Sequence, residues 1–196
     1  MKRYVAIEGV DGSGKSTVAR AVADRLRESG MSVVAVREPG GSPLGEQIRA
    51  LLLHGDDMTP WTEALLFAAQ RAQLAATVIG PALAAGSVVV TDRSYYSSLA
   101  YQGGARGLGV EEVRSVNEAG LGGIVPDLVV VLWVDPEDAL ARQEGVDRIG
   151  GEGEDFQRSV ADAYRLLAER DPAGVRLVDA SRDSAAVVDE IVGMVT

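Results

Sequence analysis

One segment near the beginning of the chain has the residue types and the spacing that phosphate binding requires. Residues 9–16 read Gly-Val-Asp-Gly-Ser-Gly-Lys-Ser and fit the pattern G-x-x-x-x-G-K-[ST]. The glycines let backbone N–H groups turn toward phosphate oxygens, because no Cβ atom stands in the way. Lys15 can reach the β- and γ-phosphates, and the Ser16 hydroxyl is suited to bind Mg²⁺. The pattern therefore predicts a binding site for a nucleoside triphosphate.

The whole loop and the residue after it are expected to contact this nucleotide. A helix that follows the loop would point its positive end at the same phosphate groups. The predicted nucleotide-binding residues of the loop are Gly9, Val10, Asp11, Gly12, Ser13, Gly14, Lys15, Ser16 and Thr17.

Short apolar runs alternate with amphipathic segments along the rest of the chain. Strands are predicted at the continuous apolar runs, within residues 1–8, 32–36, 87–91, 128–134 and 176–178. Helices are predicted at residues 15–29, 43–54, 61–85 (kinked or ended near Gly80-Pro81), 94–102, 110–119, 136–144, 155–170 and 184–195. Buried strands that alternate with helices imply a parallel sheet covered on both faces. The predicted fold is an α/β three-layer sandwich with a five-stranded parallel sheet flanked by helices.

The length of 196 residues predicts one domain, residues 1–196. Within it, residues 145–155 read GVDRIGGEGED, a glycine-rich and charged composition that is typical of a mobile loop. We expect a mobile lid at approximately residues 142–156.

The composition excludes several kinds of partner and location. The chain has 19 basic and 29 acidic residues and a net charge of −10, which argues against binding to nucleic acid. Its densest apolar run, residues 128–134, is much shorter than the ~20 residues of a membrane-spanning helix. The absence of cysteine suits a cytoplasmic protein. We therefore expect a cytoplasmic protein with neither nucleic acid nor a membrane as partner.

Nucleotide binding alone fits GTPases, ATP-driven motors, small-molecule kinases and regulatory ATPases. A GTPase would need an Asn-Lys-x-Asp motif to read guanine, and no lysine lies beyond Lys15. The remaining classes must be distinguished by the loops at the carboxyl ends of the strands, where open α/β sheets bind their ligands.

Three further segments carry a resemblance to a known family. Residues 37–49 read REPGGSPLGEQIR, residues 66–73 read LFAAQRAQ, and residues 92–103 read DRSYYSSLAYQG. Together with residues 8–17 and Pro126-Asp127-Leu128, they closely resemble bacterial thymidylate kinases over nearly the whole chain. The R-E-P-G-G and D-R-x-x-x-S-x-x-A-Y-Q segments are specific to that family, whereas the phosphate-binding loop is generic.

This resemblance implies a P-loop nucleoside monophosphate kinase that works in dTTP biosynthesis. The implied reaction is ATP + dTMP → ADP + dTDP, with Mg²⁺ entering together with ATP. Ser16 and Asp92 are the metal ligands that we expect on this basis. The family is usually homodimeric, so a homodimer is expected here.

Two residues of the second segment suit the recognition of a pyrimidine base. Phe67 and Arg71 are four residues apart and therefore share one face of a helix. A flat apolar ring beside a planar donor group suits stacking on a pyrimidine with a hydrogen bond to its carbonyl oxygen. The resemblance implies that Phe67 stacks on thymine and that Arg71 binds its O4 atom.

The resemblance also implies roles for the other polar residues of these segments. Arg49 and Arg93 would bind the phosphate of the acceptor nucleotide, and Ser98 and Gln102 would lie near its base. Tyr101 would disfavour a ribose 2′-hydroxyl. Asp11 and Glu38 would be the carboxylates near the sugar and the metal. The peptide bond between Glu38 and Pro39 is expected to be cis on the same grounds.

Catalysis in such an enzyme is an electrostatic problem, because two polyanions must be brought together in an acidic protein. No arginine occupies residues 10–13, and thymidylate kinases without one there generally supply an arginine from the lid. Arg148 is the best match and Arg142, predicted to contact the nucleotide, is the next. The predicted catalytic residues are Lys15, Arg93, Arg148 and Asp11.

Two alternatives remain open. Ser94 stands where many relatives carry an aromatic residue, and Asp-Arg-Ser also resembles deoxynucleoside kinases, which phosphorylate a sugar hydroxyl and lack the R-E-P-G-G segment. The second alternative is a regulator that binds ATP without turning over a small acceptor.

Overall fold

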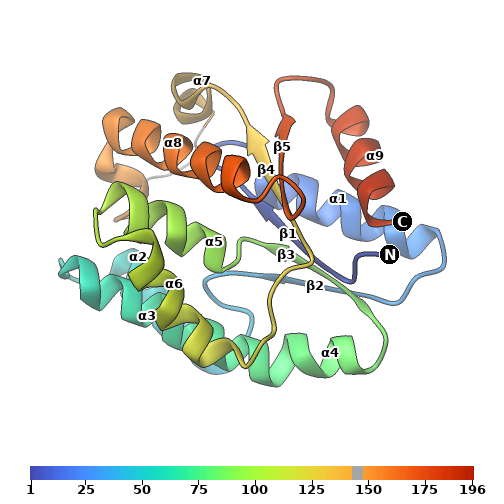
Figure 1. The fold of residues 1–196 in the computed structure, drawn as a ribbon, viewed down its shortest axis with the longest axis horizontal. Helices are drawn as coiled ribbons and strands as arrows, with labels where there is room; N and C mark the ends of the chain where they lie inside the picture. The colour runs from blue at the N-terminus through green and yellow to red at the C-terminus, as the bar shows by residue number, and fades with distance from the viewer. Residues whose placement is uncertain (143–147) are drawn as a thin grey trace.

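The computed structural model describes residues 1–142 and 148–196. In these residues, five strands form one sheet: β1 (Tyr4–Glu8), β2 (Val33–Arg37), β3 (Val88–Asp92), β4 (Leu128–Trp133) and β5 (Val175–Asp179). All neighbouring strands are parallel, and their order across the sheet is β2-β3-β1-β4-β5 (Figure 1). The predicted five-stranded parallel sheet is confirmed.

Helices cover both faces of the sheet, as Figure 1 shows. One face packs against α1 (Lys15–Glu28) and α9 (Ser184–Val195). The other packs against a larger group: α2 (Pro43–His54), α3 (Pro60–Leu74), α4 (Gly80–Ala84), α5 (Tyr95–Ser98), α6 (Val110–Leu121) and α8 (Glu154–Arg170). The short α7 (Pro136–Ala141) follows β4. This arrangement is the three-layer sandwich that the sequence predicts.

The alternation of side chains along β1 divides the core between the two faces. Val5 and Ile7 are fully buried against α1 and α9, whereas Ala6 is buried against the opposite helices. Successive strand side chains point to opposite sides of a sheet, so a continuously apolar strand serves both layers. The run of apolar residues in β1 is therefore required by burial on both faces.

Two predicted helices are interrupted by π-helical turns. Residues 61–85 form α3, a π-helical segment at Ala75–Ile79 and α4, so the regular hydrogen bonding changes just before Pro81. Proline has no N–H to donate to a preceding turn, and such a local widening accommodates it. A second π-helical segment, Leu99–Ala105, extends α5 beyond the predicted end at residue 102.

The predicted lid is described only in part, because residues 143–147 lie outside the described residues. Gly150–Glu152 form a short 3₁₀ turn, and Ile149 is buried. The backbone N–H of Arg148 donates to the carbonyl oxygen of Leu53 at 3.2 Å. This part of the lid packs against the end of α2, where the composition predicted a loop. Lid mobility remains a prediction.

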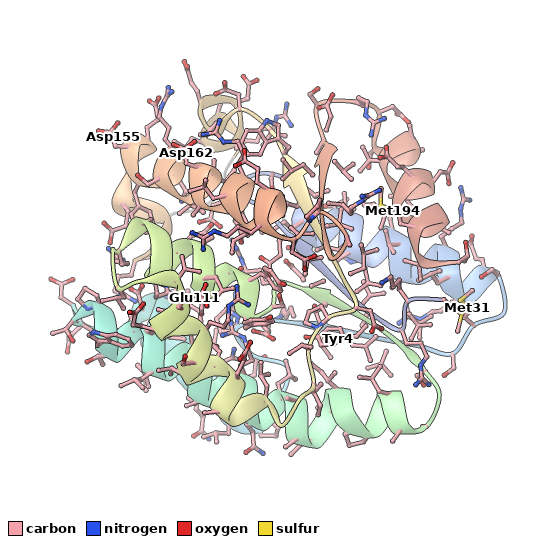
Figure 2. All side chains as sticks on the ribbon, in the orientation of Figure 1. Tyr4, Met31, Glu111, Asp155, Asp162 and Met194 are labelled. Atoms are coloured by element: carbon pink, nitrogen blue, oxygen red, sulfur yellow. The ribbon has the colours of Figure 1, made fainter. Side chains whose placement is uncertain are left out.

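The outer surface carries much of the negative charge. Figure 2 shows Glu111 on α6 and Asp155 and Asp162 on α8, and all three side chains are exposed.

Among the described helices, none has the length and apolarity to cross a bilayer.

A pair of leucine substitutions tests whether the side chain of Leu132 in β4 is packed in the core. Leu132 in β4 is 1% exposed, and Leu177 in the neighbouring β5 is 41% exposed. Leu132→Ala should lower the free energy of unfolding by about 2–5 kcal/mol, because it leaves a buried cavity. Leu177→Ala should cost below about 1 kcal/mol, since its side chain already contacts water. Urea denaturation measures both values, and equal losses would contradict the assigned packing.

Candidate active site

A cleft of about 560 Å³ lies at the carboxyl ends of β1, β2 and β3. This is the edge at which open parallel sheets bind ligands. The structure brings together most of the residues predicted from the sequence: the cleft is lined by Asp11, Gly12, Gly14, Lys15, Ser16, Thr17, Glu38, Arg49, Phe67, Asp92, Arg93, Ser98, Tyr101, Gln102 and Arg142.

The phosphate-binding loop occupies one end of this cleft. Gly14 has a φ of +86° and is the N-cap residue of α1, whose N-terminus faces the loop. Gly12 has a φ of +80°, and a Cβ atom there would lie 1.9 Å from the carbonyl oxygen of Ala139. The loop can therefore pack against α7 only with glycine at this position. Gly9 and Val10 belong to the loop without lining the cleft, and Ser13 lines a second hollow behind it.

Lys15 is buried beneath the loop. Its Nζ donates to the carbonyl oxygen of Val10 at 2.6 Å and lies 3.9 Å from Asp11. Burial and, after it, the positive charge of Arg93 lower the pKa of Lys15 to about 8, against the opposing attraction of Asp11 and Asp92. A phosphate bound beside Lys15 would raise this pKa and favour the charged form of the lysine.

Ser16 and Asp92, the two predicted metal ligands, are in contact. The Ser16 hydroxyl donates to an Asp92 carboxylate oxygen at 2.5 Å. Mg²⁺ in nucleotide sites is usually bound by one or two protein oxygens together with phosphate oxygens and water. A hydroxyl and a carboxylate beside the phosphate loop fit that requirement.

Arg93 lies against the phosphate loop, and several contacts fix its position. Its guanidinium pairs with Asp11, and its Nη1 donates to the hydroxyl of Ser97 at 3.1 Å. The backbone φ of Arg93 is +73°, a region that residues with a side chain rarely adopt. Burial favours a higher pKa for Asp11, but the charges of Arg93 and Lys15 outweigh it and lower that pKa.

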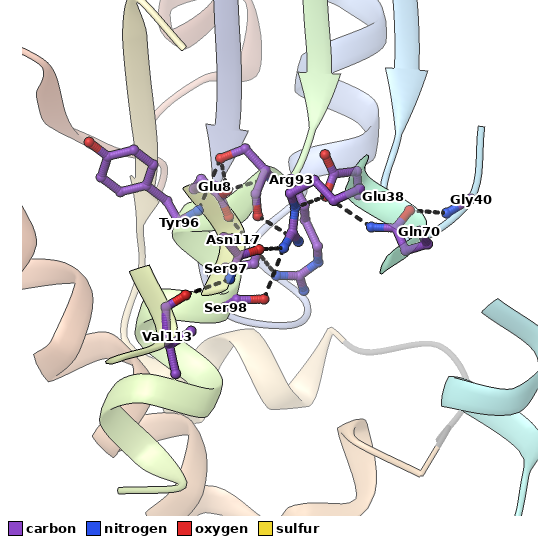
Figure 3. A network of polar contacts seen from close by, with 12 residues as sticks. Glu8, Glu38, Gly40, Gln70, Arg93, Tyr96, Ser97, Ser98, Val113 and Asn117 are labelled. Carbon is purple, nitrogen blue, oxygen red and sulfur yellow. Dashed lines mark hydrogen bonds and ion pairs between the residues drawn. The ribbon is translucent and has the colours of Figure 1, made fainter. Parts of the chain in front are cut away.

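The position of Arg93 depends on Glu8, which sequence reasoning missed. This fully buried carboxylate ends β1 and accepts hydrogen bonds from the backbone N–H and hydroxyl of Ser94 at 2.6 and 2.8 Å (Figure 3). It also accepts from Ser97 at 2.6 Å and from Tyr164 at 2.7 Å. The Ser94 hydroxyl in turn accepts from the backbone N–H of Tyr96 at 3.2 Å, which caps α5. The serine that departs from the relatives' pattern is thus part of this network.

Glu38 anchors the other side of the cleft. The Glu38–Pro39 peptide bond is cis, as the resemblance implies. One Glu38 oxygen accepts from Arg71 at 2.5 Å and from Gln70 at 3.2 Å (Figure 3). The other oxygen, Oε1, is buried and has no partner among the described residues. Burial raises the pKa of Glu38 despite the opposing charge of Arg71.

Arg71 lies behind the wall of the cleft, whereas Phe67 lines it. The Arg71 side chain is 2% exposed. Besides Glu38, it donates to Asn117, to Ser98 at 3.1 Å and to the carbonyl oxygen of Ser94 at 3.1 Å. Its predicted contact with the base stays a prediction. Asn117, on α6, carries no sequence signal of this role.

The two predicted lid arginines lie in different places. Arg142 lines both the cleft and the second hollow of about 390 Å³. Arg148 does not line the cleft: its Nη1 is 2.8 Å from Glu63, and its Nε donates to the carbonyl oxygen of Leu52 at 2.9 Å. The structure thus brings Arg142, but not Arg148, to the predicted phosphate region.

Gln157 joins α8 to the phosphate loop and was also missed. Its side-chain nitrogen donates to an Asp11 oxygen at 3.1 Å, and its side-chain oxygen accepts from the Asp11 backbone at 3.4 Å. A glutamine on an amphipathic helix has no sequence feature that marks such a contact.

The fold and the cleft define a protein of the P-loop kinase class. A parallel sheet carries the phosphate loop directly after β1, and the loops after β2 and β3 complete a cleft large enough for a second ligand.

Comparisons with known proteins agree with this class and narrow it. The family model described as "Thymidylate kinase" matches residues 7–191. The chain is 47% identical to a thymidylate kinase of Pelotomaculum thermopropionicum, over 92% of this chain and 86% of that protein. It is 45% identical to that of Symbiobacterium thermophilum, over 97% and 91%. It is 43% identical to that of a Synechococcus strain, over 96% and 92%. The chain belongs to the thymidylate kinase family.

The lowered pKa of Lys15 makes nucleotide binding depend on pH. Near pH 8.5, part of the lysine is neutral in the free protein. The negative charge of a bound phosphate would raise its pKa in the complex. The complex then binds more protons than the free protein, so affinity should fall as pH rises above about 8.

Calorimetry in buffers of different ionisation enthalpy measures this proton uptake. At pH 8.5, binding of ATP should take up a fraction of a proton. Lys15→Arg should abolish the uptake per mole bound, since arginine stays charged. Equal uptake by both proteins, or none by the wild type, would contradict the assigned pKa.

Proposed function

We propose that this chain transfers the γ-phosphoryl group of ATP to the phosphate of dTMP, giving ADP and dTDP for dTTP biosynthesis. A bond forms between an acceptor phosphate oxygen and the γ-phosphorus, and the bond from that phosphorus to the β-phosphate bridging oxygen breaks. The observation that carries the proposal is one continuous cleft that joins the phosphate-binding loop to the ring of Phe67. Family membership supports the same reaction.

The attacking group needs no strong general base. A phosphate monoester has a second pKa of about 6, so its oxygens are mostly ionised at pH 7. The cleft instead supplies positive charge: Lys15 for the donor phosphates, and Arg93 and Arg49 for the acceptor phosphate. Asp11 of the loop pairs with Arg93 and accepts a hydrogen bond from Gln157, so these contacts fix Arg93 relative to the loop.

Mg²⁺ bound with ATP would neutralise charge on the β- and γ-phosphates, and Ser16 and Asp92 are the residues that would hold it. The adjoining hollow beside Arg142, which is also lined by Arg182 and Ser184, suits the nucleoside part of the donor.

The opposite end of the cleft suits a thymine base and a deoxyribose. Phe67 offers a ring for stacking, with Ser98 and Gln102 beside it. Among the described residues, the hydrogen bonds of Arg71 use Nε, both N–H groups of Nη1 and one N–H of Nη2. Arginine has five N–H groups, so one N–H of Nη2 is left for the O4 atom. Tyr101 disfavours a ribose 2′-hydroxyl, and Glu38 faces the sugar.

A cytoplasmic homodimer is part of the proposal. Helices α2 and α3 pack together, and each exposes large apolar side chains at helical spacing, Leu44 and Leu51 on α2 and Trp61 and Leu65 on α3. A second copy is the partner that would cover them, and light scattering would report its mass.

The acceptor range tests the function directly. ADP release with ATP-Mg²⁺ should be fast with dTMP and much slower with thymidine, UMP and CMP, with dUMP as the test of the 5-methyl group. Thymidine lacks the acceptor phosphate that Arg49 and Arg93 bind, and UMP and CMP carry the ribose 2′-hydroxyl that Tyr101 disfavours. Coupled spectrophotometry measures each rate.

The same panel separates the alternatives. Activity with thymidine alone would favour a deoxynucleoside kinase. ADP release that no acceptor stimulates would favour an ATP-binding regulator.

The two lid arginines make a second test of the mechanism. If Arg148 neutralises charge on the γ-phosphoryl group in the transition state, Arg148→Ala should lower kcat by about two orders of magnitude or more and barely change dTMP affinity. Arg142→Ala is the comparison variant, because Arg142 is the other predicted lid arginine and lines the cleft. An unchanged kcat in Arg148→Ala would move the role to Arg142 or remove it from the lid.

A further inference from the structure

Glu63 on α3 is a buried carboxylate with an unusual number of donors. Its side chain is 1% exposed, and the mechanism above gives it no role. Oε1 accepts from the Gln102 amide nitrogen at 2.7 Å and from Arg106 Nε at 3.2 Å. Oε2 lies 3.1 Å from Arg106 Nη2 and 2.8 Å from Arg148 Nη1. One carboxylate thus contacts a residue of the cleft and two arginines.

This contact fixes which end of the Gln102 amide meets Glu63. An ionised carboxylate accepts hydrogen bonds and has none to donate, whereas a glutamine amide can do either. Burial favours a higher pKa for Glu63, but bonds from Arg106 and Gln102 and the arginine charges outweigh it and lower that pKa. Glu63 therefore stays an acceptor, and the opposite amide orientation would place two acceptors face to face.

The amide that Glu63 holds lies beside the ring proposed to stack on the base. Glu63 and Phe67 are four residues apart on the buried face of α3. Phe67 and Gln102 line the cleft, and Glu63 does not. Because one N–H of Nε2 is bound to Glu63, the amide is held in one orientation, and Oε1 is the acceptor that this orientation offers to a ligand. In the part of the chain that the structure describes, no group donates to Oε1.

We propose that Glu63 is a positioning residue that sets base specificity: by binding Nε2 of Gln102, it makes the cleft present an acceptor to the base. Thymine and uracil carry a donor at N3, whereas cytosine carries an acceptor there. The Glu63-oriented amide therefore selects N3–H pyrimidines and rejects cytosine, and it is indifferent to the 5-methyl group. This inference rests on the proposed function, since it assumes that the Phe67 end binds the base.

Glu63→Gln replaces a carboxylate, which only accepts hydrogen bonds, with an amide of nearly the same shape that also donates them. The single amide oxygen of the new side chain should face Arg148 and Arg106 Nη2, because bonds from charged donors are the stronger ones. Its NH₂ group then faces Gln102, whose amide must turn over to accept it. The cleft would consequently present a donor, which matches cytosine N3.

The test compares kcat/KM for dTMP, dUMP and dCMP on one preparation of each variant. A ratio measured on one preparation is independent of the fraction that is folded. In Glu63→Gln the ratio of dTMP to dCMP should fall by about tenfold or more, as expected when a site loses a hydrogen bond that it was built to make. The ratio of dTMP to dUMP should stay the same. Glu63→Asp, which still only accepts, should keep both ratios near the wild-type values.

Arg106→Gln is the matched control, since it removes an arginine from the same carboxylate and leaves the Gln102 contact. Its dTMP to dCMP ratio should remain within about twofold of the wild type, whatever its stability. An equal fall in Arg106→Gln and Glu63→Gln, or no fall in Glu63→Gln, would overturn the inference.

A second variant covers the case in which Glu63→Gln does not fold. Gln102→Leu removes the acceptor itself, so its dTMP to dCMP ratio should fall as well, and an unchanged ratio would overturn the inference. If the wild type turns over dTMP while these ratios do not change, the proposed function stands and only the role of Glu63 fails. If the wild type does not use dTMP, the proposed function fails first.

Discussion

Concentrating positive charge in one cleft of an acidic protein is the constraint on which the rest of this structure depends. The chain has a net charge of −10, and an anion meets repulsion over most of its surface. Cations that bind two nucleotides must therefore be few and held in place. Lys15 is fixed by Val10 and Asp11, and Arg93 is fixed by Asp11 and Ser97.

Buried acids provide much of this positioning, so the negative charge of the chain is part of the site. Glu8 holds the segment of Arg93, Glu38 holds Arg71, and Glu63 holds Arg148 and the amide of Gln102. The sheet determines where two of them lie, since Glu8 ends β1 and Glu38 follows β2. Each acid limits the geometry of a donor, and breaking such a buried contact costs more than forming it gains.

The sequence predicts what depends on local chemistry. The phosphate loop, the five strands and the bounds of α2 follow from spacing, periodicity and capping residues, and the comparisons confirm the family. The buried acid network does not follow, because Glu63 and Gln102 are far apart in the chain and meet only after folding. For the same reason, the sequence could not show that Arg71 lies behind the cleft wall or that Arg148 pairs with Glu63.

The most direct test of the central claim is a crystal structure with dTMP and a non-hydrolysable ATP analogue bound together. The account predicts that the donor phosphates lie on the loop within hydrogen-bond distance of Lys15. It also predicts that the acceptor phosphate lies on Arg93 and the base on Phe67. Phosphates held away from Lys15 and Arg93, with the base elsewhere, would contradict it.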